Sequence, residues 1–183
     1  METMKKCKPA VFLDRDGVLT KEKSYVTSVD DLEIFPYVRQ CIQDIRQKGY
    51  WTIVVTNQSA VARGMLAEAV LCRMNDYLCQ KTGVDAVYYC PHHPRAEVEA
   101  YRIKCSCRKP QPGMFLQAMK DFSIDKERSY MVGDRAVDIL AGKQIGLKTI
   151  LLESGYGLKK LEFDVEPDYV LEDLRKVCQL LSF

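Results

Sequence analysis

VFLDRDGV, residues 11–18, decides the fold that we expect for this chain. Three apolar residues followed by a turn signal are typical of a buried strand in a parallel sheet. Ligands bind beyond the carboxyl ends of such strands, where Asp14 and Asp16 would lie. Two carboxylates this close repel each other unless a cation or a proton neutralises one of them. The pair suits a nucleophile, a proton donor and Mg²⁺ acting together. An Asp-rich turn without chemistry is the alternative.

Similar apolar runs alternate with helix-like stretches along the rest of the chain. Strands are expected at residues 9–13, 51–55, 84–89, 129–132, 147–152 and 168–170, and helices at 36–48, 67–81, 112–122, 135–144 and 171–181. This alternation predicts an α/β fold, a Rossmann-like open parallel sheet with helices on both faces. A length of 183 residues favours a single domain, residues 1–183. The long irregular stretch at residues 90–110 is expected to be functional or held by a ligand.

The composition is that of an ordinary globular protein, with 47% hydrophobic residues, 28% charged residues and a net charge of +2. The near-neutral charge predicts no nucleic-acid or membrane partner. Because no signal-peptide pattern or membrane-length apolar run is evident, we expect a cytoplasmic protein, in which disulfides are rare. Five of the eight cysteines are interpreted as small buried hydrophobic residues. These are Cys7, Cys41, Cys72, Cys79 and Cys178.

The other three cysteines cluster with histidines in the long loop. Cys90, His92 and His93 lie in the motif CPHHP, and Cys105 and Cys107 lie in CSC. Two ligand pairs separated by a loop of ordinary length are typical of a closed, tetrahedral zinc site. Since nothing here supplies an open coordination position, we expect the zinc to be structural. The spacing does not decide between His92 and His93.

Two further segments carry groups that suit phosphate. Residues 55–59, VTNQS, follow a predicted strand and form either a phosphate cradle or a polar turn that caps a helix. Arg108 and Lys109 precede the helix that Pro112 opens. Two cations beside a helix N-terminus oppose the helix dipole, which favours an anion between them. A solvated basic loop is the alternative.

The motif MVGDRAVD, residues 131–138, places Asp134 after another predicted strand. Its carboxylate is suited either to ligate Mg²⁺ or to cap the next helix. Asp138 lies one helical turn later and would orient its neighbours.

Together these motifs resemble the haloacid dehalogenase superfamily of phosphohydrolases and, within it, the heptose-bisphosphate phosphatases. The likeness covers about residues 9–157 and includes LDRDGV, VTNQS followed by ARG, YYCPHHP, CSCRKPQPGM and YMVGDRAVD, in that order. It implies hydrolysis of the 7-phosphate of heptose 1,7-bisphosphate, for nucleotide-activated heptose, by an enzyme without a large cap domain. Histidinol-phosphate phosphatases are the alternative, although the PGM that follows RKP argues against them.

The resemblance also implies roles for residues at matching positions. Asp14 would be the nucleophile that forms an aspartyl-phosphate, and Asp16 would be the acid and base. Thr56 and Lys109 would stabilise the phosphoryl group. Mg²⁺ would be held by Asp14, the backbone carbonyl of Asp16, and Asp134.

The remaining implied roles concern zinc and substrate. Zinc would bind Cys90, His92, Cys105 and Cys107. The residues expected to contact the small-molecule sugar phosphate are Arg15, Glu22, Lys23, Ser24, Tyr25, Asn57, Gln58, Ser59, Arg108 and Arg135. Arg135 stands where relatives often have lysine, which leaves the anomer of the sugar open.

Two other classes of function remain to be weighed. A catalytically silent, zinc-stabilised binding module would have lost one of the aspartates or the lysine, and none is lost here. A phosphatase of nucleic-acid ends is disfavoured by the near-neutral charge. We expect a monomer that binds neither nucleic acid nor membrane.

Overall fold

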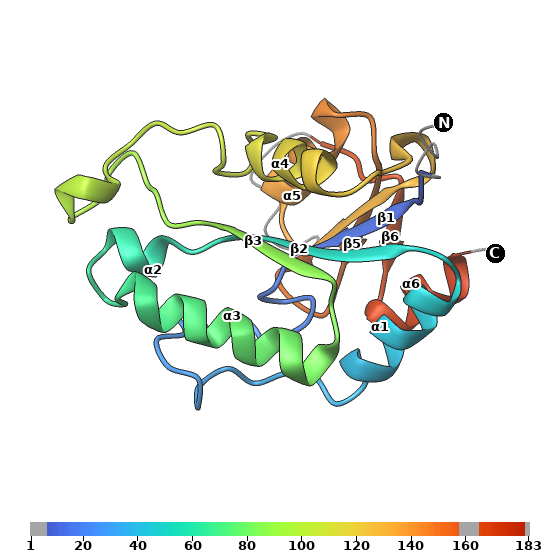
Figure 1. Ribbon diagram of the computed structural model, residues 1–183, viewed down its shortest axis with the longest axis horizontal. Coiled ribbons are helices and arrows are strands. Elements are labelled where there is room, and N and C mark those ends of the chain that lie inside the picture. The colour runs from blue at the N-terminus through green and yellow to red at the C-terminus, as the bar shows by residue number, and fades with distance from the viewer. Residues whose placement is uncertain (1–6, 158–164, 182–183) are drawn as a thin grey trace, which may run out of the picture.

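The computed structural model describes residues 7–157 and 165–181. At its centre lies a six-stranded sheet with the order β3-β2-β1-β4-β5-β6, in which every pairing of named strands is parallel (Figure 1). The strands are β1 (Ala10–Leu13), β2 (Trp51–Asn57), β3 (Ala86–Cys90), β4 (Tyr130–Gly133), β5 (Lys148–Leu152) and β6 (Tyr169–Leu171). The predicted Rossmann-like open parallel sheet is confirmed.

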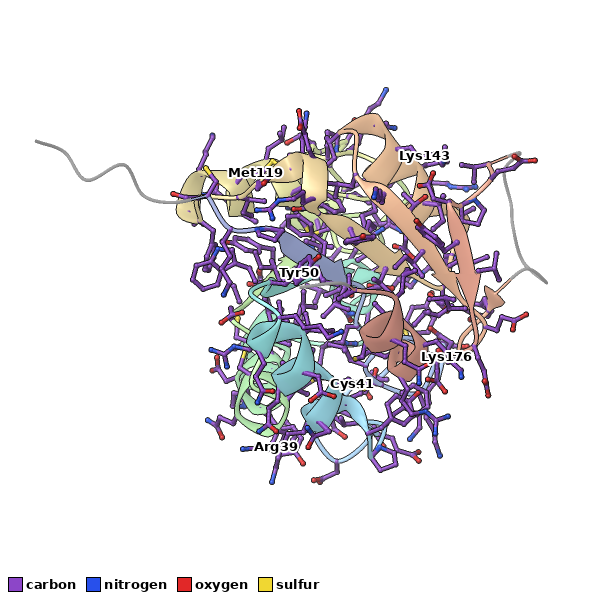
Figure 2. The ribbon with its side chains drawn as sticks, turned by 90° about the vertical axis from the view of Figure 1, so that its right-hand side faces the viewer. Arg39, Cys41, Tyr50, Met119, Lys143 and Lys176 are labelled. Carbon is purple, nitrogen blue, oxygen red and sulfur yellow. The ribbon has the colours of Figure 1, made fainter. Side chains whose placement is uncertain are left out.

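Helices cover both faces of this sheet (Figure 1). One face carries α1 (Val38–Gln47), α3 (Glu68–Thr82) and α6 (Leu174–Leu180), and the other carries α4 (Gly113–Asp121) and α5 (Ala136–Gln144). Figure 2 shows α1, which bears Cys41, beside α6, with Met119 of α4 and Lys143 of α5 on the opposite side. In the part of the chain that the structure describes, no helix is both long and apolar enough to span a bilayer.

The central strand β1 separates two hydrophobic cores. Val11 and Leu13 belong to the core beneath α1, α3 and α6, whereas Phe12 packs beneath α4, where its ring lies 5.0 Å from that of Phe115. Side chains alternate between the faces of a strand, so a strand covered on both faces is apolar throughout. This double burial explains the continuous apolar run that begins the sequence motif, and it fixes the carboxyl end of β1 where Asp14 begins.

Some local predictions differ from the structure. Strand β2 runs to Asn57, two residues beyond the predicted 51–55, because its last residue pairs with Cys90 of β3. The short helix α2 (Ser59–Ala62) was not predicted, since four residues are too few for helical periodicity to show. The loop at residues 90–110 contains a 3₁₀ turn, η1 (Glu99–Tyr101), and a second, η2 (Lys126–Arg128), precedes β4.

The prediction that the five scattered cysteines are buried is wrong for Cys7 and Cys72, which are exposed. Cys41 is buried, and Cys79 and Cys178 are half-buried. On α3 the buried residues recur with helical spacing and include Leu71, Met74, Asn75 and Leu78. Position 72 falls outside this stripe, so its side chain faces solvent.

Candidate active site

The segments that follow β1, β2, β3, β4 and β5 surround a cavity of about 560 Å³. Its lining brings together Asp14, Asp16 and Lys109 with every residue that the sequence predicts to contact substrate. Those are Arg15, Glu22, Lys23, Ser24, Tyr25, Asn57, Gln58, Ser59, Arg108 and Arg135. Two other predicted residues, Thr56 and Asp134, are almost completely buried and lie behind the cavity surface. Parallel strands thus deliver side chains from distant segments to one edge of the sheet.

Lys109 is almost completely buried, with only 2% of its surface exposed. Its Nζ lies 2.9 Å from Asp14 Oδ1 and 2.7 Å from Asp138 Oδ1, and it donates to the Val55 carbonyl at 2.6 Å. Burial lowers the pKa of Lys109, but the two carboxylates outweigh it and leave that pKa raised. Lys109 therefore stays protonated, and the alternative of a solvated basic loop is wrong for it.

Asn57 holds the backbone of Lys109 in place. Its Nδ2 donates to the Lys109 carbonyl at 3.0 Å, and its Oδ1 accepts the Lys109 N–H, also at 3.0 Å. The helix α2 that follows is capped by no side chain at Gln58. The polar residues at the end of β2 therefore do more than form a capping turn, because the Asn57 side chain positions Lys109 in the cavity.

The carboxylate of Asp16 accepts hydrogen bonds from three side chains. Arg15 reaches it with Nη2 at 2.9 Å, Gln58 with Nε2 at 2.8 Å and Thr20 with Oγ1 at 3.1 Å. Gln58 also donates to Thr56 Oγ1 at 3.0 Å. Arg15 and Gln58 are nearly inaccessible to solvent. Both side chains therefore contribute to the site by orienting the Asp16 carboxylate at the cavity wall.

Asp134 is fully buried behind Asp14. Its Oδ2 accepts the backbone N–H of Tyr156 at 2.9 Å, while its Oδ1 has no hydrogen-bond partner among the described residues. A Cβ atom at Gly17 or Gly155 would lie 2.3 Å or 2.0 Å from Oδ2. Only glycine at these two positions lets the flanking loops close on the carboxylate. Asp134 does not cap α5, since Arg135 occupies that position and Asp138 Oδ2 accepts its N–H at 3.1 Å.

The carboxylates of Asp14, Asp134 and Asp138 lie within 4.8 Å of one another. Burial raises the pKa of Asp14 to about 6, with further contributions from Asp138 and Asp16 and opposition from Lys109. Burial also raises the pKa of Asp134 to about 8, helped by Asp138 and Asp14. The cluster offers hard oxygen donors, including the unpartnered Oδ1 of Asp134. Its three acidic side chains face a single lysine. These features fit a divalent cation such as Mg²⁺.

A second cluster lies in the long loop, where Cys90, His92, Cys105 and Cys107 meet. Their ligand atoms all lie within 4.8 Å of one another, with Sγ separations of 2.9 to 3.5 Å and His92 Nδ1 at 3.4 Å from Cys107 Sγ. Three sulfurs and one imidazole nitrogen in this arrangement fit a closed tetrahedral zinc site. His93 instead lines the active-site cavity, so the geometry separates the two histidines.

The sequence predicted no role at this cavity for Tyr156, and it predicted His93 only as a possible zinc ligand, yet both residues line the cavity. Tyr156 follows β5, lines the cavity and binds Asp134 through its backbone. His93 lines the same cavity, and its Nδ1 accepts the Arg95 N–H at 3.1 Å. The tight ESGYG turn after β5 was a weak signal for Tyr156, since it follows a strand at the same sheet edge.

Comparison with protein families and curated sequences identifies similar proteins. The model of a family described as HAD-hydrolase-like matches residues 106–177. The chain is 42% identical over 174 residues to a D-glycero-beta-D-manno-heptose-1,7-bisphosphate 7-phosphatase of Haemophilus ducreyi, covering 91% of this chain and 94% of that protein. A protein of the same name from Escherichia coli O6:H1 is 37% identical over 185 residues, covering 98% and 97%.

Two solved structures of heptose bisphosphate phosphatases are also similar to this chain. The crystal structure of the D,D-heptose 1,7-bisphosphate phosphatase from B. bronchiseptica, complexed with magnesium and phosphate, matches with a TM-score of 0.80 and 32% identity, covering 94% of this chain and 97% of that one. The corresponding phosphatase from Burkholderia thailandensis matches with a TM-score of 0.66 and 25% identity, covering 94% and 97%.

Proposed function

Because this chain belongs to the haloacid dehalogenase-like hydrolases, and within them to the family of heptose-1,7-bisphosphate 7-phosphatases, we propose that it removes the 7-phosphate from D-glycero-D-manno-heptose 1,7-bisphosphate. The observation that carries this proposal is the buried cluster of Asp14, Lys109 and Asp134 at the floor of a cavity with a cationic wall. Its floor suits one phosphoryl group, and its wall suits the remainder of an anionic sugar.

The wall of the cavity supports a substrate with a second phosphate. Arg108 and Arg135 both line the cavity, and Arg108 Nη1 donates to the His92 carbonyl at 3.0 Å. Burial lowers the pKa of Arg108, and the nearby Arg135 and Arg63 lower it further. Cations gathered in this way repel one another, so an anion between them is favourable. A bisphosphate supplies that anion, whereas histidinol phosphate carries only one phosphate and an ammonium group.

In the proposed mechanism, an oxygen of Asp14 attacks phosphorus and the bond from phosphorus to the sugar oxygen breaks. Asp16 donates a proton to the departing oxygen, which leaves an aspartyl-phosphate on Asp14. Asp16 then accepts a proton from water, which attacks the same phosphorus and frees Asp14. Both steps use the carboxylates of Asp14 and Asp16. Lys109 holds Asp14. Arg15 and Gln58 hold Asp16.

We propose Mg²⁺ as the catalytic cofactor, with Asp14 and Asp134 as ligands together with the backbone carbonyl of Asp16. The orphaned Asp134 Oδ1 and the naming of magnesium in the B. bronchiseptica phosphatase structure support it. When bound, Mg²⁺ would neutralise negative charge on the phosphoryl oxygens. Lys109 supplies a fixed positive charge at the same place, and Thr56 supports Gln58 from behind.

We propose one structural zinc ion, bound by Cys90, His92, Cys105 and Cys107. The loop that would hold it ends directly at Arg108 and Lys109. Closing the loop therefore sets the direction from which both cations enter the cavity. We further propose that the chain is a single domain and acts as a monomer.

The anomer of the sugar belongs to the same proposal. Both curated relatives carry names that specify the β anomer, and we propose the β anomer for this enzyme. The product, heptose 1-phosphate, would keep an anomeric phosphate suitable for activation by a nucleotide. Arg135 lines the same cavity and would contact the substrate there.

A phosphate-release panel tests this proposal. It would compare the β and α anomers of heptose 1,7-bisphosphate with histidinol phosphate and a 3′-phosphorylated oligonucleotide, each with Mg²⁺. The expected result is the highest kcat/KM for the β anomer, with ³¹P spectra showing loss of the 7-phosphate only. Faster hydrolysis of histidinol phosphate would assign the enzyme to the alternative class.

A further inference from the structure

Tyr156 connects three parts of the cavity that come from distant segments of the chain. Its backbone N–H binds Asp134, its phenol hydroxyl donates to Glu22 Oε1 at 3.3 Å, and its ring lies 5.3 Å from the Arg135 guanidinium carbon. The residue itself lines the cavity. One side chain thus touches both a residue expected to bind the sugar and a cation of the wall.

The loop that carries Glu22 adopts an uncommon backbone conformation. Ser24 has a φ of 59°, which is the left-handed region and the only such value at a non-glycine residue in the described chain. Glu22 Oε1 accepts the Ser24 N–H at 2.7 Å, and the same oxygen accepts the Tyr156 hydroxyl. A residue held in this region costs free energy that surrounding contacts must offset. The Glu22 carboxylate, steadied by Tyr156, provides those contacts.

Lys23 and Tyr25, which flank Ser24 and also line the cavity, make further contacts with other segments. Lys23 Nζ lies 3.3 Å from Glu33 Oε2 and donates to the Asp31 carbonyl at 3.1 Å. The Tyr25 ring lies 5.7 Å from the guanidinium carbon of Arg63. These contacts hold the loop together with the hydrogen bond from Tyr156 to Glu22.

We propose that Tyr156 is a specificity-determining positioning residue, which fixes Glu22 and Arg135 for recognition of the sugar end of the substrate. This inference rests on the proposed function, because it assumes a substrate that extends from the reacting phosphate to the wall. The phenol hydroxyl acts through Glu22, and the ring acts through Arg135. The phenol hydroxyl contacts Glu22 and the ring contacts Arg135, and neither of these residues has a role in the proposed chemical step.

The variant Tyr156→Phe isolates the hydroxyl. It retains the ring beside Arg135 and the backbone N–H that binds Asp134, so the floor of the site is preserved. Losing one hydrogen bond to a charged group predicts a rise of about tenfold in KM for heptose bisphosphate, with kcat nearly unchanged. Hydrolysis of p-nitrophenyl phosphate should keep its kcat/KM, since an aryl phosphate has no group that reaches Glu22 or Arg135.

A matched control and a double variant sharpen the test. Tyr88→Phe removes another tyrosine hydroxyl bonded to a carboxylate, 2.6 Å from Asp121 Oδ2 and outside the cavity, and should change neither substrate's kinetics. In a Glu22→Ala background, Tyr156→Phe should add no more than about a twofold rise in KM, since residues acting through one another are not additive.

Two results would overturn the proposal. One is an unchanged KM in Tyr156→Phe, and the other is an equal loss of kcat with both substrates, which would place Tyr156 in support of Asp134 instead. The kinetics are measured with whichever phosphosugar the wild-type enzyme hydrolyses best in the panel above. Failure of the heptose assignment would therefore appear in the wild-type panel, whereas failure of this inference would appear only in the ratio of variant to wild type.

Discussion

Asn57 and Lys109 face each other through a reciprocal pair of hydrogen bonds, each 3.0 Å long, between a side-chain amide and a backbone. Asn57 is the last residue of strand β2, and Lys109 lies at the end of the cysteine-rich loop. Only a group with one donor and one acceptor side by side makes both bonds. The position of the buried Lys109 ammonium therefore depends on Asn57 as well as on the carboxylates that it contacts.

Replacing Asn57 by Asp tests this dependence. The carboxylate would set an oxygen against the Lys109 carbonyl, which removes one bond and adds repulsion. Since small displacements of a catalytic group cost up to about a hundredfold in rate, we expect kcat to fall by about 10- to 100-fold. Steady-state kinetics with Mg²⁺ check this, and a wild-type kcat would show that Lys109 is positioned by its ion pairs alone.

Asp14→Asn is expected to abolish turnover while the protein stays folded. The amide keeps the shape of the side chain but is a poor nucleophile, and loss of a nucleophile costs about 10³-fold or more in kcat. Lys109 keeps Asp138 as an ionic partner, so the fold retains a compensated buried charge. Phosphate release and circular dichroism measure the two halves. Substantial turnover by this variant would rule out the aspartyl-phosphate.

The stability of the Mg²⁺-free protein should fall as pH rises. The pKa of Asp14 is raised from 3.8 to about 6, and that of Asp134 from 3.8 to about 8. From pH 3.8 up to about pH 8, the folded state therefore binds more protons than the unfolded chain. The free energy of unfolding then decreases with pH through that window. Mg²⁺ needs the ionised carboxylates. Added Mg²⁺ should therefore raise the melting temperature more at about pH 8 than at about pH 5.5.

Thermal melts with and without Mg²⁺ at both pH values provide that measurement. Asp134→Asn is the matched variant, since it removes the carboxylate whose pKa is raised most. An equal Mg²⁺ effect at both pH values would contradict the assignment of these carboxylates as ligands. Activity should also disappear on careful removal of Mg²⁺ and return when it is restored, without loss of zinc.

Cys105→Ser is expected to lower the zinc content and to expose the loop at residues 90–110 to proteases. Substrate use should weaken because Arg108 and Lys109 lie at the end of that loop. The sheet should survive, since one core contains no zinc ligand and Cys105 is only partly buried against the other. Elemental analysis and limited proteolysis measure the effect, and Cys7→Ser at an exposed position serves as the control. A wild-type protein that is metal-free yet protease-resistant in the loop would overturn the zinc site.

Much of the fold was predictable because the buried strands are apolar on both faces. Val11 to Leu13 and the corresponding runs before Asp134 and Thr56 mark strands whose carboxyl ends share one edge, so the meeting of the acids there followed from topology. The short helix α2 and the ends of β2 depend on pairing with other segments. Local sequence carries little information about such pairings.

The supporting contacts of the site were harder to predict. The family resemblance implies substrate contacts for Asn57, Gln58 and Arg15, and it gives no hint that their polar atoms also bond to Lys109 and Asp16. Tyr156 carries no motif, and its partners come from segments that are more than twenty and more than a hundred residues away in the chain. Such relationships arise from three-dimensional packing.

The sheet order also sets when the site can exist during synthesis. Strand β1, which carries Asp14, lies between β2 and β4, and β4 emerges more than a hundred residues after β1. Until Tyr130–Gly133 has left the ribosome, one edge of β1 remains unpaired and Asp134 is absent. Such long-range pairing slows folding and leaves a strand edge open to wrong partners. The nascent chain is therefore inactive, and most prone to aggregation, until its second half closes the sheet.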